Sequence, residues 1–357
     1  MDLLERTAAL VDVASVSHGE GPITDAIEST LRGVAGLVVD RVGDNVVART
    51  VLGRAERLIL AGHTDTVPAN GNERARVEGD VVWGCGAADM KGGLAVMVEL
   101  AESLPEPLLD VTYVFYAGEE VAAEHNGLLQ LFRDRPELLV GDVALLGEPT
   151  DGAIEAGCQG TMRVEVVLRG VRAHTARPWM GRNAIHRMGA LLQFLESRQD
   201  WRRVQVEGCE YREAVSGVSV RGGVAGNVVP DTVTLTLNHR FAPDRSCAQA
   251  EAALRAELDP FIEADDGWTL IDAVEGATPG LDHPILGELV ARTGLEVRAK
   301  LGWTDVARFA AHGIPASNFG PGDALLAHTA EERVTRAQLE RTHAALADLL
   351  SRPREAR

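Results

Sequence analysis

Short apolar runs alternate with longer amphipathic stretches along the first half of the chain. The apolar runs are rich in β-branched residues and predict strands, whereas the longer stretches predict helices. The expected strands are 46–51, 57–61, 111–117 and 143–146, and the expected helices are 92–103 and 127–133. This order predicts an α/β fold with a mostly parallel sheet and helices on both faces.

The order of predicted strands and helices changes at about Thr161. Strands are expected at 162–170, 215–223, 232–241 and 268–276, and helices at 183–197 and 247–258. The order β-α-β-β-α-β is that of a ferredoxin-like α+β sandwich.

The α/β character returns after Pro279, with expected helices at 284–294 and 335–352 and a strand at 315–320. We therefore expect two domains, which the length of 357 residues also favours. Residues 161–278 form a domain inserted into a first domain made of residues 1–160 and 279–357. The charged tail, 352–357, has the composition of a disordered segment.

The chain is acidic, with a formal net charge of -18. This charge argues against nucleic acid or an anionic membrane surface as a partner. The hydrophobic content of 45% is ordinary for a globular protein. No stretch approaches the roughly 18 uncharged apolar residues of a membrane span.

The four cysteines are scattered and form no CxxC pair. They are Cys85, Cys158, Cys209 and Cys247. This pattern predicts reduced thiols in a cytoplasmic protein. The first 17 residues carry charges between their apolar positions, and predict an amphipathic helix rather than a signal peptide.

Histidine and acidic side chains recur just beyond the predicted strands of the α/β part. They are His63, Asp89, the pair Glu119–Glu120, Glu148 and His328. In open α/β sheets, ligands bind outside the carboxyl ends of the strands, where such loops converge. Nitrogen and oxygen donors without cysteine suit zinc, cobalt or manganese. The pattern predicts a two-metal hydrolase.

Each motif alone has another interpretation. His63 and Asp65 could be a strand-end histidine capped by an aspartate, and Asp89 could lie in an ordinary helix-entry turn. The pair Glu119–Glu120 could be a solvated acidic turn, and His328 a structural histidine. In the metal interpretation, Asp65 holds the imidazole of His63, and Asp89 bridges the two cations. Adjacent glutamates diverge, so one can ligate a metal while the other faces the attacking water.

The conjunction of motifs is more specific than any one of them. The segments GHTDTVP, GCGAADMKGG, AGEE, LGEPT and RGVRAHTARPWMGRNAIH resemble the signatures of the M20 family of zinc peptidases and deacylases. Within this family the chain is most similar to the succinyl-diaminopimelate desuccinylases of the actinobacterial type. The resemblance extends from the first histidine motif to His328.

The resemblance implies a zinc-peptidase-like catalytic domain that binds two zinc ions per subunit, with Co²⁺ or Mn²⁺ able to substitute. Asp89 would bridge the ions. His63 and Glu148 would complete one position, and Glu120 and His328 the other.

The resemblance also makes Glu119 the general base and Asp65 the residue that orients His63. It implies a cis peptide bond between Asp89 and Met90. His174 would reach the scissile carbonyl from the partner subunit of a homodimer formed through the inserted domain.

Substrate binding is implied for two further groups of residues. Asn227 and Arg240 match polar residues that hold the acidic end of an N-acyl amino acid, for which the arginine fork is well suited. The segment LGWTDVARF departs from the GGTSDGRF of many desuccinylases, and Thr304, Asp305 and Arg308 would keep the corresponding roles.

The expected activity is hydrolysis of N-succinyl-L,L-2,6-diaminopimelate to succinate and L,L-diaminopimelate, which serves lysine and peptidoglycan precursor synthesis. One alternative is another M20 deacylase or exopeptidase, such as an acetylornithine deacetylase or a carboxypeptidase, because such enzymes would share every metal ligand. A second alternative is a metal-binding homologue without catalytic activity. The presence of Glu119 argues against it, because such homologues usually lose the base.

Overall fold

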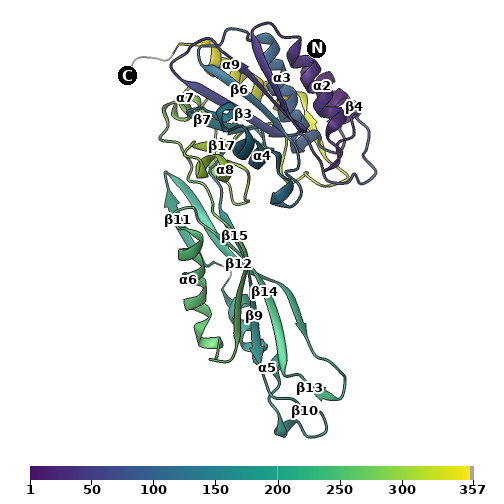
Figure 1. Cartoon of the computed structure of the whole chain (residues 1–357), viewed down its shortest axis with the longest axis vertical. Helices are drawn as coiled ribbons and strands as arrows, with labels where there is room; N and C mark the ends of the chain where they lie inside the picture. Colours follow the sequence, from purple (N-terminus) through teal and green to yellow (C-terminus); the bar gives the residue numbers. More distant parts are fainter. Residues whose placement is uncertain (199, 354–357) are drawn as a thin grey trace. The chain divides into compact units, whose positions relative to one another are not determined.

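The computed structural model describes residues 1–198 and 200–353, so the end of the tail expected to be disordered lies outside the described residues. Figure 1 shows the elements of the chain. The chain divides into two compact units, and each is described by itself. Unit 1 comprises Met1–Gly157, Pro279–Arg298 and Thr304–Arg357, and unit 2 comprises Cys158–Thr278 and Ala299–Trp303. The short segment Ala299–Trp303, which we expected in the first domain, belongs to unit 2.

Unit 1 is built on an eight-stranded mixed sheet with the order β1-β2-β6-β3-β7-β17-β8-β16. Its strands are β1 (Leu37–Val42), β2 (Asn45–Thr50), β3 (Arg57–His63), β6 (Asp110–Tyr116), β7 (Val143–Leu146), β8 (Ile154–Ala156), β16 (Val297–Ala299) and β17 (Ala316–Asn318). The four central strands β6, β3, β7 and β17 run parallel. Strands β3, β6 and β7 are mainly apolar because they are buried on both faces, and β6 and β7 are buried at every position.

Helices cover both faces of this sheet, as the sequence predicts. They are α1 (Leu3–Val11), α2 (Gly21–Arg32), α3 (Gly92–Ser103), α4 (Gly127–Asp134), α7 (Pro284–Thr293), α8 (Val306–Ala311) and α9 (Arg336–Ser351). Helix α3 lies in the connection from β3 to β6, and α4 lies in the connection from β6 to β7. The second connection crosses the sheet in the direction opposite to the first. Right-handed crossovers therefore place α3 and α4 on opposite faces. Helix α3 packs against the sheet and against α1 and α9, which explains why it is apolar nearly all round.

A second, three-stranded sheet in unit 1 has the order β18-β5-β4. It consists of β4 (Arg76–Glu78), β5 (Val81–Trp83) and β18 (Arg333–Thr335). The antiparallel pairing of β5 with β18 joins the chain just before Asp89 to the chain just after His328. The sequence analysis did not predict this sheet.

Unit 2 has the βαββαβ order predicted for it. Its main elements are β9 (Gly160–Arg169), α5 (Ala184–Ser197), β12 (Cys209–Gly222), β14 (Thr232–Phe241), α6 (Cys247–Leu258) and β15 (Gly267–Val274). The sheet order is β11-β12-β14-β9-β15, with antiparallel neighbours throughout. The strand β11 (Arg202–Val206), which we did not predict, forms a hairpin with β12 through a turn at Glu207 and Gly208.

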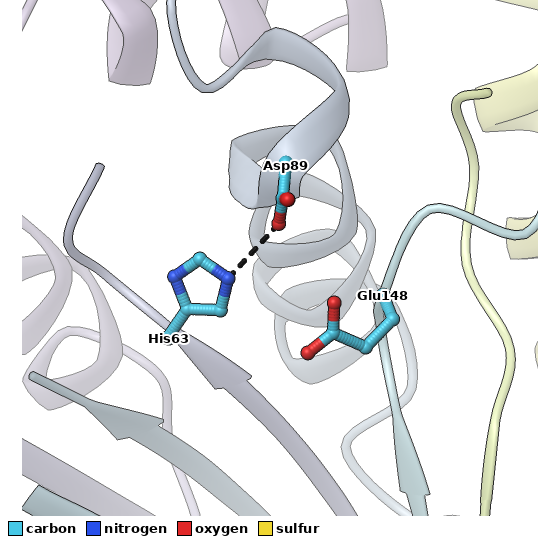
Figure 2. Close-up of side chains that lie close together, drawn as sticks. All are labelled: His63, Asp89 and Glu148. Atoms are coloured by element: carbon cyan, nitrogen blue, oxygen red, sulfur yellow. Dashed lines mark hydrogen bonds and ion pairs between the residues drawn. The ribbon is translucent and has the colours of Figure 1, made fainter. Parts of the chain in front are cut away.

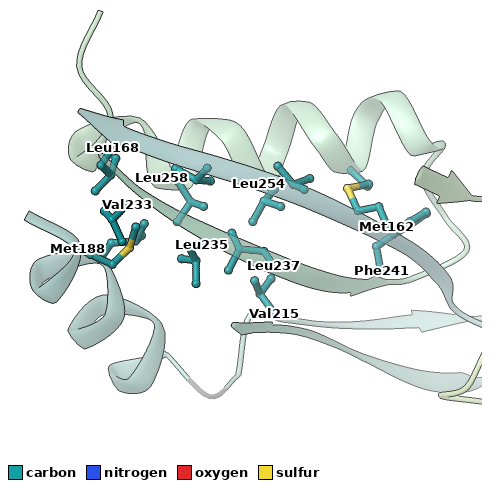
Figure 3. Packing of buried hydrophobic residues seen from close by; sticks show 14 of the residues in the cluster. Met162, Leu168, Met188, Val215, Val233, Leu235, Leu237, Phe241, Leu254 and Leu258 are labelled. Atoms are coloured by element: carbon teal, nitrogen blue, oxygen red, sulfur yellow. The ribbon is translucent and has the colours of Figure 1, made fainter. Parts of the chain in front are cut away.

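The core of unit 2 follows from strict alternation along its central strands. Every second residue of β9 and β14 is buried, among them Val166 and Leu235. These side chains pack with Met188 and Leu191 of α5 and with Leu254 of α6, as Figure 3 shows for part of the cluster. One face of the sheet is thus covered by both helices.

Two short strands lie outside this sheet, β10 (Ala173–His174) and β13 (Val228–Val229), and they pair with each other.

Within residues 1–198 and 200–353, no helix combines the length and apolar character that a membrane crossing requires.

Candidate metal centre

The parallel strands of unit 1 bring the predicted ligands to one edge of the sheet. Strand β3 ends at His63, which lies opposite Tyr116, the last residue of β6. Glu119 and Glu120 follow β6 within four residues, and Glu148 follows β7 within two. Because neighbouring parallel strands end on the same side, these donors converge.

The first candidate ligand group is His63, Asp89 and Glu148, whose donor atoms all lie within 4.8 Å of one another. The His63 Nε2 atom is 3.0 Å from Asp89 Oδ1. Figure 2 shows the carboxylate of Glu148 directed toward the same space. His63 and Glu148 are only 1% and 6% exposed, so their side chains are held by the surrounding core.

The second group is Asp89, Glu120 and His328, whose donor atoms are also within 4.8 Å of one another. The His328 Nε2 atom lies 2.9 Å from Glu120 Oε1 and 3.5 Å from Asp89 Oδ2. Asp89 therefore belongs to both groups, with one oxygen facing His63 and the other facing His328. This is the arrangement that a carboxylate bridging two cations requires.

The donor set fits two divalent cations. It consists of two imidazoles and three carboxylates, without thiolates, and one carboxylate is shared between the groups. A third combination, His63, Glu119 and Glu120, also lies within 4.8 Å. Glu119 is thus close enough to the centre to act on a molecule bound there.

Asp65 lies beside His63 and contacts it through both its backbone and its side chain. The His63 Nδ1 atom lies 3.0 Å from the backbone carbonyl oxygen of Asp65, and its distance to the carboxylate is 3.6 Å. The carboxylate also accepts hydrogen bonds from the backbone N–H groups of Glu119 (3.0 Å) and Glu120 (3.1 Å) and from the Ser17 hydroxyl (2.8 Å). Burial opposes ionisation of Asp65, but the imidazole of His63 and these hydrogen bonds hold its pKa at about 2.

The pKa of Glu119 is raised well above its usual range. Burial is the largest cause, and the nearby carboxylates of Asp305, Glu148 and Glu120 raise it further, against a lowering effect of His63. Such a concentration of negative charge favours divalent cations, which bind carboxylates in their deprotonated form.

The pKa of His328 is raised to about 9 by its hydrogen bond to Asp89 and by the charge of Glu120. The raised pKa favours the protonated imidazole in the metal-free chain, whereas a metal ligand is a neutral imidazole. Metal binding at the second group would displace this proton.

Thr304, Asp305 and Arg308 form part of an internal hydrogen-bond network of unit 1. The Thr304 hydroxyl donates to Asn318 Oδ1 (2.9 Å), and Asp305 accepts from Asn126 Nδ2 (2.9 Å) and from Arg308 Nε. Thr304 and Asp305 are buried. Asp305 lies near enough to Glu119 to affect its pKa, so this network borders the metal centre.

The remaining predicted residues belong to unit 2. His174 is exposed on β10, and Asn227 is exposed just before β13, where its carbonyl oxygen accepts from Thr175 N (3.0 Å). The pairing of β10 with β13 thus keeps these two residues in adjacent segments. Arg240 lies on β14 and donates from Nε to Asn238 Oδ1 (3.2 Å). Burial lowers the pKa of Arg240.

The sequence analysis missed one residue that contacts the centre. The side chain of Glu332 accepts hydrogen bonds from the backbone N–H groups of Ala88 and Asp89, each at 3.0 Å. The sequence places Glu332 four residues after His328, which is the only indication that it lies near the centre. Its contact with the loop of Asp89 depends on the fold. The Asp89–Met90 peptide bond next to it is cis, as the resemblance implied.

Comparison with known proteins agrees with this geometry. Residues 59–352 match the family model of peptidase family M20/M25/M40. The chain belongs to this family. Family membership and the two ligand groups that share Asp89 indicate a dinuclear metal site.

Two curated relatives cover nearly the whole chain. A putative succinyl-diaminopimelate desuccinylase of Mycobacterium tuberculosis is 53% identical over 334 residues, which is 93% of each chain. The succinyl-diaminopimelate desuccinylase of Corynebacterium glutamicum is 43% identical over 358 residues, 98% of this chain and 96% of the relative.

Solved structures share the fold at lower sequence identity. A tripeptidase from Staphylococcus aureus matches with a TM-score of 0.78 and 22% identity, over 98% of this chain and 96% of its own. A dinuclear metal binding peptidase of the M20 family from Bacillus subtilis matches with a TM-score of 0.70 and 17% identity, over 97% and 96%.

Proposed function

We propose that this protein is a succinyl-diaminopimelate desuccinylase. It hydrolyses N-succinyl-L,L-2,6-diaminopimelate to succinate and L,L-diaminopimelate, and so serves lysine and peptidoglycan precursor synthesis. The observation that carries the proposal is the pair of ligand groups sharing Asp89, in a chain 53% and 43% identical to two proteins named for this activity.

We propose zinc as the metal at both positions, with cobalt or manganese able to substitute. His63 and Glu148 would serve one position, Glu120 and His328 the other, and Asp89 both. When bound, the ions supply an acidified water and polarise the amide carbonyl.

Glu119 would act as the general base. It takes a proton from the attacking water and returns it to the leaving amine as the amide bond breaks. The buried, carboxylate-rich surroundings that raise its pKa support this role, because they let the side chain hold a proton between the two steps. Asp65 would fix the turn that carries Glu119 and Glu120.

Unit 2 would form a homodimer, as expected for the inserted domain. Strand β12 pairs with β11 only as far as Glu213, so its continuation to Gly222 is an open edge of the sheet as far as the chain is described. Val218 and Val220 are 57% and 50% exposed along it. An apolar strand edge of this kind is a surface that natural proteins usually cover.

The dimer would complete each active site. His174 would stabilise the negative charge that develops on the carbonyl oxygen of a substrate in the partner subunit, a type of interaction that is often the largest catalytic contribution. Asn227 and Arg240 would hold a carboxylate of the substrate. Thr304 and Arg308 would contact the amino-acid end, with Asp305 holding the Arg308 guanidinium.

The protein would work in the cytoplasm. The four cysteines, all within the described residues, are thiols rather than disulfides, and three of them are buried, which fits a reducing compartment.

A substrate panel tests the assignment. Metal-loaded protein is assayed with N-succinyl-L,L-diaminopimelate, its N-acetyl analogue, N-acetylornithine and a dipeptide. We expect kcat/KM to favour the succinyl compound by at least about 100-fold over the acetyl analogue. The acetyl analogue lacks the succinyl carboxylate, and leaving the partly buried guanidinium of Arg240 without that partner costs a few kcal/mol. Equal kcat/KM for both acyl groups would leave only the general deacylase assignment.

A further inference from the structure

We infer that Glu332 is a positioning residue for the second metal position, the one served by Asp89, Glu120 and His328. Its carboxylate holds the backbone of the bridging aspartate, and its own backbone ties the segment of His328 to the same loop. The inference rests on the proposed dinuclear site.

The side chain of Glu332 holds the loop of Asp89 directly. One carboxylate oxygen accepts the backbone N–H groups of both Ala88 and Asp89 at 3.0 Å. Glu332 is only 1% exposed, so water does not compete for these bonds. Two hydrogen bonds from adjacent N–H groups to one buried carboxylate restrict the movement of that loop.

The main chain of Glu332 provides a second connection. Gly84 N donates to the Glu332 carbonyl oxygen (3.1 Å), next to the pairing of β5 with β18. Asn72 Nδ2 donates to the Thr329 carbonyl oxygen (3.1 Å), and Asn72 in turn accepts from Cys85 N (2.9 Å). The segment that follows His328 is therefore bound to the segment that precedes Asp89 at several points.

The two metal positions depend on this connection to different degrees. His63 is the last residue of β3, Glu148 follows β7, and both are buried, so their placement does not require Glu332. The His328 side chain is 50% exposed, and its loop is held by the contacts just described. Loss of the Glu332 carboxylate loosens Asp89, which serves both positions, and also removes the side-chain link between the Asp89 loop and the segment of His328, so the second position should weaken more than the first.

The test uses Glu332→Gln with Glu331→Gln as a matched control. Glutamine keeps one acceptor oxygen but loses the negative charge, so the two N–H groups of the Asp89 loop are left with a weaker, neutral acceptor. Glu331 is the exposed neighbour and undergoes the same chemical change. Metal-free full-length protein is titrated with Zn²⁺ by calorimetry, and bound zinc is counted by elemental analysis.

We expect two zinc ions per chain in the unmodified protein and in Glu331→Gln. In Glu332→Gln, the affinity for one ion should fall about 10- to 100-fold, the usual cost of losing a residue that orients a ligand. The affinity for the other ion should change less than about 5-fold, which is below the 10- to 100-fold range expected for a lost orienting residue. At zinc concentrations that refill the weak position, kcat should recover with KM unchanged, a behaviour that a general loss of stability would not produce.

Several results would overturn the inference. One is an unchanged affinity of Glu332→Gln for both ions, and another is an equal loss at both positions. Circular dichroism of the metal-free variant monitors folding. If Glu332→Gln does not fold, Glu332→Asp, which keeps the buried charge but shortens the side chain, takes its place and should weaken the same ion. A protein that binds fewer than two ions before any substitution would refute the proposed function instead.

Discussion

The carboxylate of Asp65 accepts the backbone N–H groups of both Glu119 and Glu120. The proposed base and a proposed ligand of the second metal position are therefore held by one side chain from the end of the neighbouring strand. The backbone carbonyl of the same residue faces His63 Nδ1, which fixes the ring with its other nitrogen toward Asp89. One residue thus connects three members of the centre.

We predict that Asp65→Asn lowers kcat about 10- to 100-fold, because the turn of Glu119 and Glu120 loses a charged acceptor. KM should change little, and zinc content should stay near two per chain at saturating zinc. Ser17→Ala is the matched control, since it removes only the hydroxyl donor to the same carboxylate. Steady-state kinetics beside elemental analysis checks the prediction, and equal effects of both variants would contradict it.

Glu119→Gln should keep both metal ions and lose kcat by about 10²- to 10⁴-fold, because the ligands remain while the proton carrier is gone. Glu124→Gln, an exposed carboxylate on the following loop, serves as the control and should behave like the unmodified protein. If Glu119→Gln keeps more than about a tenth of the activity, another group is the base.

His328 should make the stability of the metal-free protein depend on pH. Its pKa is raised to about 9 from 6.5, so the charged form is favoured in the folded state. Its stabilising contribution is therefore complete below about pH 6.5 and is lost as the pH rises through about 9. The difference in Tm between the unmodified protein and His328→Gln should accordingly be largest near pH 6 and vanish near pH 10. A difference in Tm that grows with pH would contradict a raised pKa of His328 in the folded state.

The dimer proposal can be tested by complementation. His174→Ala and Glu119→Gln subunits should each be inactive as homodimers, but their heterodimer retains one complete site if His174 acts across the interface. We expect up to about half of the unmodified activity per heterodimer, whose composition is verified by mass spectrometry. No recovery in a verified heterodimer would show that His174 does not act from the partner subunit.

The sequence predicted many of the long elements and the convergence of the strand-end donors, although helix α2 and strand β1 were not predicted. Long apolar runs and amphipathic stretches carry periodicity, and helix 92–103 and strand 143–146 have the predicted bounds. A parallel sheet then brings residues such as His63 and Glu148 together without further information, because its strands end on one side.

Other features depend on contacts between distant segments and could not be read from the sequence. Strands β4, β5 and β18 have three residues each, too few to show periodicity. The contact of Glu332 with the Asp89 loop joins residues 243 positions apart. The hydrogen bonds that the Asp65 carboxylate accepts depend on the turn after β6, whereas the HxD spacing indicated only the contact with His63. The hairpin strand β11 (RRVQV) is rich in polar residues and has no fully buried position, so its sequence carries only a weak strand pattern.

The most direct measurement of the central claim is the release of succinate from N-succinyl-L,L-diaminopimelate by protein of defined metal content. The account predicts that chelated protein is inactive and that activity returns on adding zinc to two ions per chain. Succinate and L,L-diaminopimelate should then appear in equal amounts. Protein that holds two zinc ions per chain and releases no succinate would contradict the account.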